Sequence, residues 1–288
     1  MKKYIYYIYI LLGAACWGMI GLFTRTLGEL GVSVFQRVTI RNFGALVVMT
    51  LVFALTKREV FRIQPRHLLL FAGSGLLSVQ GMTLTSFVCQ QECSLAVSGI
   101  LLYLAPSFVV LMGAALWKAP ITKRKVTALA LAFGGCVLVS GIMSGGLTVS
   151  PLGLVMGIAS GFCYATYTVF AHYVMDHYGS LTMTYWTFVF AGLGSLCFWD
   201  TAALTAVFTD PTGIWSGLGL IVVATVLPYL LYTKGLEGVE SGKASIMANV
   251  EPVVGALVGV FVFGETLSVW VILGVVCMLG GVMLLAKE

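Results

Sequence analysis

Long apolar runs, separated by short polar segments, extend along the whole chain. Residues 5–23 contain no charged side chain, and comparable runs recur to the C-terminus. A helix needs ~20 apolar residues to cross the ~30 Å core of a bilayer, whereas strands of a membrane barrel alternate over only ~10 residues. The pattern therefore predicts membrane-spanning helices at approximately residues 5–23, 35–55, 68–88, 94–116, 126–144, 151–174, 181–199, 217–234, 244–262 and 269–286.

These spans form two related halves. Pro106 and Pro252 are 146 positions apart, and so are the pairs Gly134-Gly135 and Gly280-Gly281. We expect two repeats of five helices, at residues 1–145 and 146–288. Because five is odd, the second repeat must enter the membrane in the opposite orientation. The predicted fold is an all-α integral membrane protein of ten transmembrane helices in two inverted repeats, as in many transporters, whose substrate lies between the repeats.

Composition and charge agree with this fold. Hydrophobic residues make up 59% of the chain and charged residues 9%, against ~25% in soluble domains. With the N-terminus in the cytoplasm, 13 of the 16 basic residues lie in cytoplasmic segments. We therefore predict a multi-pass plasma-membrane protein with both termini cytoplasmic. The net charge of +5 reflects topology and contact with anionic lipids, and does not indicate nucleic-acid binding.

The first apolar run has no clear cleavage site and is expected to remain as a helix. Most of the seven cysteines lie within predicted spans, where they act as apolar packing residues, although Cys89 and Cys93 flank a short loop and could pair. The three histidines accompany no Cys-x-x-Cys sequence, and the chain has no nucleotide-binding loop motif. We expect no metal, no cofactor and no enzymatic activity.

Glu251 is the first candidate for a functional residue. It lies near the middle of the ninth span, where a carboxylate costs ~2.5–3.5 kcal/mol and usually faces an aqueous cavity. A low dielectric favours the protonated form, so Glu251 is a candidate proton-coupling site or a partner for a substrate amine. In the alternative, structural role, protonated Glu251 bonds to backbone freed by Pro252. Ala105 holds the corresponding place in the first repeat.

Four further polar residues are candidates. Arg37 and Arg41 share one face near the outer end of the second span, where they would attract anions or, in the case of Arg41, contact substrate or Glu251. Snorkelling to lipid headgroups is the alternative. Gln80 and Asn249 are mid-span amides that either contact substrate or form interhelical hydrogen bonds, worth ~0.6 kcal/mol on average.

Aromatic and helix-shaping residues complete the candidates. Trp17, Tyr103, Tyr164 and Tyr167 lie mid-span, away from the membrane interfaces, and would line a cavity for a planar or cationic substrate or else pack in the core. Three prolines are predicted to kink helices and to act as gate elements, namely Pro106, Pro228 and Pro252. The glycine steps at Gly153, Gly157 and Gly161 are more typical of helix packing.

Several segments resemble a known family. They are Ala14-Ala15-Cys16-Trp17-Gly18, Leu101-Leu102-Tyr103-Leu104-Ala105-Pro106, Asn249-Val250-Glu251-Pro252 and Phe263-Gly264-Glu265. The chain resembles the drug/metabolite transporter superfamily, in its ten-helix branch with two EamA-type repeats, over nearly its whole length. The resemblance implies transport of a metabolite without identifying it. Lys118-Ala119 stands in the first repeat where the second has Gly264-Glu265, so any helix-end role of that glutamate is absent there.

We expect a secondary transporter that exports a small amino-acid-like or amphipathic metabolite, driven by proton antiport through Glu251 or by the substrate gradient. Its partners would be the small-molecule substrate, protons and membrane lipids, and it would be a monomer or homodimer. The alternatives are a lipid or lipid-carrier flippase of the same fold and a metabolite exchanger or importer. A membrane enzyme acting on lipid-linked substrates would need clustered polar catalytic groups, which the sequence lacks, and a membrane scaffold would not need Glu251.

Overall fold

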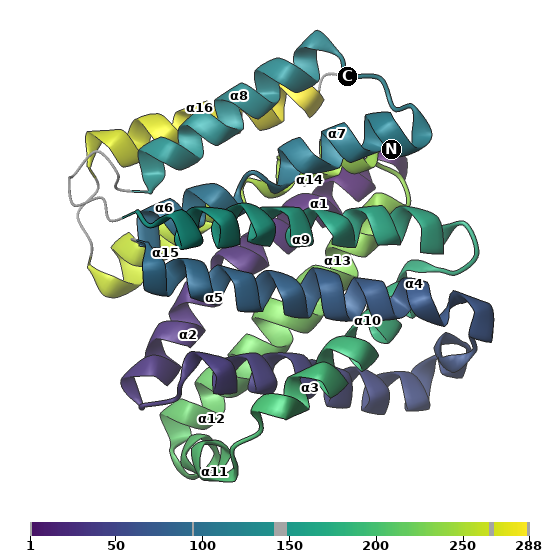
Figure 1. Cartoon of the computed structure of the whole chain (residues 1–288), viewed down its shortest axis with the longest axis vertical. Coiled ribbons are helices and arrows are strands. Elements are labelled where there is room, and N and C mark those ends of the chain that lie inside the picture. Colours follow the sequence, from purple (N-terminus) through teal and green to yellow (C-terminus); the bar gives the residue numbers. More distant parts are fainter. Residues whose placement is uncertain (1, 94, 141–148, 265–267, 287–288) are drawn as a thin grey trace.

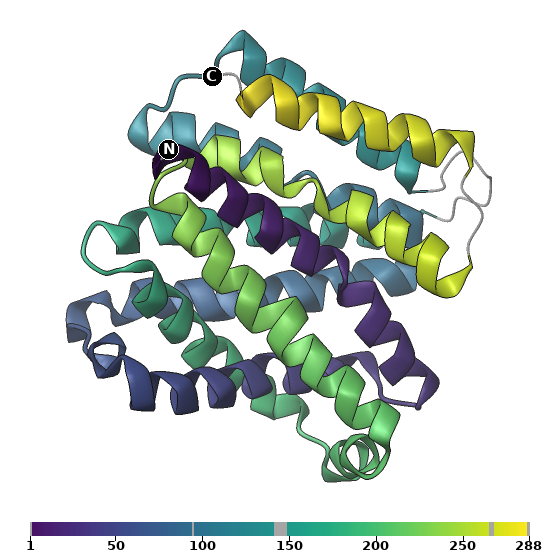
Figure 2. The same cartoon turned by 180° about the vertical axis from the view of Figure 1, so that it is seen from behind.

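The computed structural model describes residues 2–93, 95–140, 149–264 and 268–286, and all regular structure within them is helical (Figures 1 and 2). Glu265 and the ends of some predicted spans lie outside these residues. The first half contains α1 (Lys2–Gly18), α2 (Ile20–Glu29), α3 (Val34–Thr56), the 3₁₀ turns Arg58–Phe61 and Pro65–His67, α4 (Leu68–Ala72), the π-helical stretch Gly73–Gly81, α5 (Met82–Glu92), α6 (Leu95–Leu102), α7 (Ala105–Trp117) and α8 (Lys123–Val139).

The second half repeats this order. It contains α9 (Pro151–Met175), α10 (Ser180–Ser195), the 3₁₀ turn Leu196–Phe198, α11 (Thr201–Thr209), α12 (Pro211–Leu218), the π-helical stretch Gly219–Val226, α13 (Leu227–Leu236), α14 (Ser241–Ala248), α15 (Glu251–Phe263) and α16 (Val269–Ala286).

The predicted fold class is confirmed. Eight helical stretches within the described residues are long and apolar enough to cross a membrane, and several combine two or three of the elements above. The fifth and tenth predicted spans correspond to α8 and α16, of 17 and 18 residues. α1 and α9 run in opposite directions through the bundle, and so do α8 and α16, as expected for inverted repeats (Figure 1).

The 146-residue offset of the sequence recurs in the backbone. It separates the start of α3 from that of α10, the start of α8 from that of α16, and the starts of the two π-helical stretches. It also separates the left-handed residues that end α7 and α15, Lys118 with φ 55° and Gly264 with φ 67°. The two halves therefore share their helix ends and irregularities even where their side chains differ.

The fourth predicted span of each repeat is interrupted one turn before a proline. α6 and α7 are separated by Tyr103-Leu104, and α14 and α15 by Asn249-Val250. A proline cannot donate to the carbonyl four residues earlier and its ring crowds that turn, so the helix ends and restarts there. Pro106 and Pro252 accordingly occupy the first turns of α7 and α15. The second break places Glu251 at the start of a helix in mid-bundle.

Only one glycine of each pair, Gly134-Gly135 and Gly280-Gly281, faces the α8–α16 contact. This contact lies at one edge of the bundle (Figures 1 and 2). A β-carbon on Gly135 would lie 2.7 Å from the carbonyl oxygen of Gly274, and one on Gly281 would lie 3.0 Å from that of Ala128. Gly134 has no neighbour within 4 Å among the described atoms. One glycine of each pair thus permits close helix packing.

Two segments between the predicted spans are helical. Arg25, which follows the predicted span 5–23, lies inside α2, because the first helical stretch continues to Glu29. Residues 200–216, between the predicted spans 181–199 and 217–234, contain α11 and the start of α12. The latter is capped by Asp210, whose side chain accepts from the backbone N–H groups of Thr212 and Gly213.

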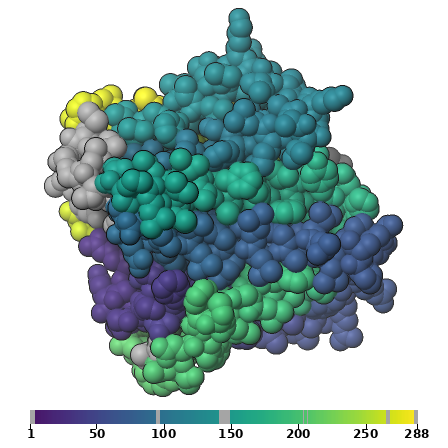
Figure 3. All heavy atoms as spheres, viewed as in Figure 1, coloured from purple at the N-terminus to yellow at the C-terminus, as the bar shows by residue number. Residues whose placement is uncertain are grey.

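Helix packing fills the face shown in Figure 3, where α5 and α9 lie side by side across the middle. The largest group of buried side chains involves α1, α3, α9, α10 and α13. Cys89 and Cys93 are both buried and free, so the pairing considered from sequence is absent.

Candidate functional site

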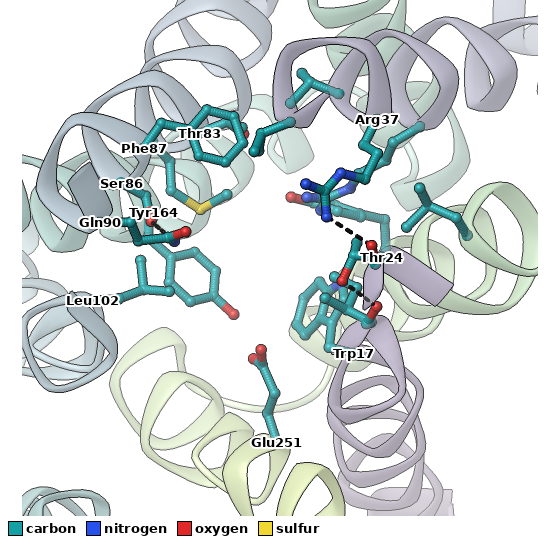
Figure 4. Close-up of a pocket in the computed structure, with 17 residues that line it drawn as sticks. Trp17, Thr24, Arg37, Thr83, Ser86, Phe87, Gln90, Leu102, Tyr164 and Glu251 are labelled. Atoms are coloured by element: carbon teal, nitrogen blue, oxygen red, sulfur yellow. Dashed lines mark hydrogen bonds between the residues drawn. The ribbon is translucent and has the colours of Figure 1, made fainter. Parts of the chain in front are cut away.

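A cavity of ≈280 Å³ lies between helices of both repeats (Figure 4). Its walls come from α1, α2, α3, α5, α9, the π-helical stretch Gly219–Val226, α13 and α15, with one residue from the end of α6. It reaches the end of the bundle where α2 ends and α3 begins, and its lining residue Gln90 is exposed there. The volume is close to the lower end of the range for small-molecule sites.

Close contact between α1 and α15 forms the inner part of this cavity. α1 ends at Gly18, and a β-carbon there would lie 2.6 Å from the backbone carbonyl oxygen of Glu251. Any larger residue would separate the two helices. The glycine thus holds its neighbour Trp17 beside the start of α15.

Trp17 is the centre of an aromatic group. Its ring lies edge to face against Tyr229, at 5.1 Å between ring centres, and against Tyr164, at 6.2 Å. The side chain is 3% exposed, yet its indole N–H has no hydrogen-bond partner among the described residues. A buried donor without a partner costs free energy, so the N–H is suited to an acceptor that enters the cavity.

Glu251 is the acidic residue among those that line the cavity. Its carboxylate points into the same space as the Tyr164 hydroxyl and the Trp17 ring (Figure 4). The hydroxyls of Tyr103 and Tyr164 lie close enough to interact with it electrostatically. These two phenols can donate to the ionised carboxylate, and their lone pairs can also accept from its protonated form.

Arg41 projects into the cavity from α3. Its Nε donates to the Thr225 hydroxyl at 3.2 Å, and its charge acts on the nearby Tyr229 hydroxyl. Its charge acts on Glu251 across the cavity. A guanidinium has five N–H donors, so hydrogens remain for a solute after these contacts.

Arg37 lies one turn nearer the mouth. Its Nη1 donates to the backbone carbonyl of Thr24 at 2.6 Å, shown as a dashed line in Figure 4. This bond holds the first turn of α3 against α2 and fixes the guanidinium at the rim of the cavity. The side chain therefore does not extend freely to lipid, as snorkelling would require.

The remaining predicted residues lie outside the cavity lining. Gln80 is buried and accepts at 3.1 Å from Asn42, leaving one polar atom of each amide without a partner among the described residues. Tyr103 lies behind Glu251, against Cys136, Val253 and Met278. Asn249 is 3% exposed at the break before α15.

Tyr167 belongs to a group of buried hydroxyls next to the cavity. It bonds to Thr233, which also accepts from Thr184 at 3.1 Å, while Thr168 and Tyr232 pair at 3.0 Å. The rings of Tyr167 and Tyr232 pack on Tyr229 and Trp17, so an aromatic layer separates the cavity from these hydroxyls. The cavity is closed on this side.

A buried ion pair lies towards the same closed end. Lys125, at the start of α8, is 2% exposed and donates to Glu240, just before α14, and to the carbonyl of Pro120 at 2.8 Å. The pair joins the two repeats. Its positions correspond by the 146-residue offset to Val271 and Ser94, which cannot form such a pair.

Sequence reasoning missed Tyr229 and the small polar residues of the mouth. Tyr229 follows Pro228 in mid-span, which is the same signal that identified other aromatics. Thr24, Thr83 and Ser86 carried no signal, because threonine and serine are common in membrane helices, where they bond to their own backbone.

Comparison with known proteins gives a consistent result. The model of the EamA-like transporter family matches residues 4–141 and 151–287. An uncharacterised transporter of Archaeoglobus fulgidus is 32% identical over 97% of this chain and 95% of its own length. The uncharacterised inner membrane transporter YicL of Salmonella typhimurium is 27% identical over 97% and 94%. A crystal structure superimposes with a TM-score of 0.80 over 97% of this chain and 95% of the other; its 18% identity shows the fold alone.

Proposed function

The chain belongs to the EamA-like transporter family and is a multi-pass membrane transporter, and from that premise we propose that it exports a small amino-acid-like or amphipathic metabolite across the plasma membrane. The observation that carries the proposal is the cavity between the repeats, which combines one carboxylate, two guanidinium groups and an aromatic wall. Binding sites between repeats are typical of secondary transporters.

The proposed orientation has both termini in the cytoplasm, with the repeats divided at residues 145 and 146. α1 begins and α16 ends at the same end of the bundle, away from the cavity mouth (Figure 1). In this orientation the mouth faces outward, while the aromatic layer and the Lys125–Glu240 pair lie on the cytoplasmic side. Release of solute to the outside would occur from this state.

Glu251 is the proposed proton-coupling residue, and Trp17, Arg41 and Tyr164 are the proposed substrate contacts, with Arg37 at the outer mouth. Support comes from their common cavity. Tyr103, Tyr167, Gln80 and Asn249 are at most indirect contacts in this state. The driving force is proton antiport or the substrate gradient, and the protein acts as a monomer or homodimer.

The test compares metabolites inside and outside cells that overproduce the native chain or Glu251→Gln at equal abundance. We expect one solute class to leave cells with the native chain and to be retained by cells with the variant. Glu59→Gln, on the 3₁₀ turn after α3, is the matched control and should export normally. Unchanged levels of every solute with the native chain would contradict export.

A further inference from the structure

We infer that the transported solute carries an acidic group, which binds at Arg41, Arg37 and the indole N–H of Trp17, and that the solute is bound while Glu251 is protonated. The inference rests on the proposed transport function and names the chemical class of its solute. It also selects between the two driving forces, because solute and proton would then move together.

The first argument is the charge of the cavity wall. Arg37 and Arg41 are the cations among the described lining residues, and Glu251 is the anion. The wall therefore carries one net positive charge with Glu251 ionised and two with Glu251 protonated. In a site of low dielectric such a wall repels a simple cation and attracts an anion. An amine that paired with Glu251 would still face two guanidinium groups.

The second argument is the supply of hydrogen-bond donors. The Trp17 N–H is buried and without a partner among the described residues, and Arg41 retains N–H groups beyond the one bound to Thr225. The unused hydrogen-bonding groups of Trp17 and Arg41 are therefore donors, which a carboxylate or another oxyanion satisfies.

The third argument is the position of Glu251 opposite Arg41. Titratable or charged groups act on Glu251 from every side, namely Arg41 on α3, Tyr103 before α7, Cys136 on α8, Tyr164 on α9 and Tyr229 on α13. Of these, Arg41 carries a positive charge. In the empty cavity, ionised Glu251 offsets the charge of Arg41. When Glu251 is protonated, the charge of Arg41 is available to bind the solute.

Protonation of Glu251 and binding of an acid therefore favour each other. The proton on Glu251 and the negative charge of the acid enter together, so the empty and loaded cavities carry the same net charge. Antiport requires that the proton and the solute never occupy the cavity together. That condition would hold only for a solute whose cationic group pairs with ionised Glu251. For an acid, the gradient of the solute itself drives export.

The test uses the purified full chain and three probes with one skeleton: 3-phenylpropanoate, 3-phenylpropanamide and 3-phenylpropylamine. We expect the acid to bind at least about tenfold more tightly than the amide or the amine, since charge-assisted hydrogen bonds are the stronger ones. Its affinity should rise as the pH is lowered from about 8 to about 6, because protonation of Glu251 frees Arg41 while the carboxylate of the probe stays ionised.

Three variants locate the effect. Arg41→Gln should remove the preference for acid over amide, and Arg41→Lys should restore part of it. Glu251→Gln mimics the protonated form, so it should bind the acid as tightly at both pH values as the native chain does at the lower one. Arg25→Gln, whose guanidinium lies over the Phe263 ring outside the cavity, is the control and should behave as native.

Equal binding of acid and amide, tightest binding of the amine, or no binding of any probe would overturn the inference. So would acid binding that weakens as the pH falls. The proposed export function is tested separately by metabolite levels in cells. Export that persists without a preference for acids would therefore leave that function standing and reject only the solute class.

Discussion

Gly18 and Glu251 are in contact through their backbones, so closely that a β-carbon on Gly18 would lie 2.6 Å from the Glu251 carbonyl oxygen. The contact joins the end of α1 in the first repeat to the start of α15 in the second. It thereby sets the distance between Trp17 and the only carboxylate among the described lining residues.

Gly18→Ala should push α1 away from α15. We expect a loss of about 1–3 kcal/mol in stability, as for overpacked interiors, and weaker solute binding, because Trp17 and Glu251 move apart. The midpoint of thermal unfolding in detergent and probe affinity are the measurements. Gly21→Ala is the control: its β-carbon meets no atom within 4 Å of those described, so a helical alanine there should be neutral or stabilising by about 0.5–1 kcal/mol. Equal effects of the two variants would contradict this role of Gly18.

Tyr229→Phe should leave the fold intact but weaken the site. The ring still packs on Trp17 and Phe188, while the hydroxyl that lies near the Arg41 guanidinium is lost. We expect affinity for an acidic probe to fall about threefold to tenfold, since Arg41 is less well positioned. Tyr185→Phe removes a hydroxyl bonded to Thr50, away from the cavity, and should bind the probe normally. Equal losses in both variants would indicate a general packing effect.

Lys125→Met should destabilise the closed end of the bundle. It leaves Glu240 without its buried partner, and we expect a loss of about 1–3 kcal/mol in stability. Breaking a fully buried pair costs about 3–5 kcal/mol, but the Glu240 side chain is 35% exposed, so the cost here is smaller. Thermal unfolding would measure this, and the added change Glu240→Gln should recover most of the loss. Lys234→Met breaks a more exposed pair with Glu237 and should cost at most about 0.5 kcal/mol. A double variant no more stable than the single one would show that the two side chains do not act as a pair.

Lys118→Gly should stabilise the protein. Lys118 is exposed and adopts a left-handed conformation at the end of α7, where the second repeat has Gly264. Removing the strain at φ 55° should gain about 0.5–1 kcal/mol, net of the greater freedom of glycine when unfolded. Lys118→Ala removes the same charge without relieving the strain. A gain in the alanine variant equal to that in the glycine variant would assign the effect to charge.

The membrane passages and the repeat could be predicted because the bilayer imposes them. A span must be apolar over its whole length, and the proline and glycine pairs fix the 146-residue offset that the helix ends later repeat. Irregularities inside a span were less accessible. The break at Asn249-Val250 follows from Pro252, but the π-helical stretches Gly73–Gly81 and Gly219–Val226 have no such signal.

The site could be predicted only in part. Trp17, Arg37, Arg41, Tyr164 and Glu251 line one cavity. Gln80 instead pairs with Asn42, and Tyr167 with Thr233. In a soluble helix the polar face indicates which side is exposed, but in lipid both the packed and the outer faces are apolar. The rotation of each helix, and hence the residues that meet, therefore depends on packing that the pattern of apolar residues does not encode.

The backbone is duplicated, but the carboxyl group is not: Glu251 begins α15 where Ala105 begins α7. A cycle that uses this carboxyl can carry at most one proton for each solute molecule. The stoichiometric limit has a thermodynamic consequence. Coupled one to one, and with no net charge moved because the acid and its proton cross together, a difference of one pH unit across the membrane balances a solute concentration ratio of about ten and no more. A larger concentration ratio would require a second ionisable group. The duplicated backbone offers the matching position at residue 105, where the sequence has alanine.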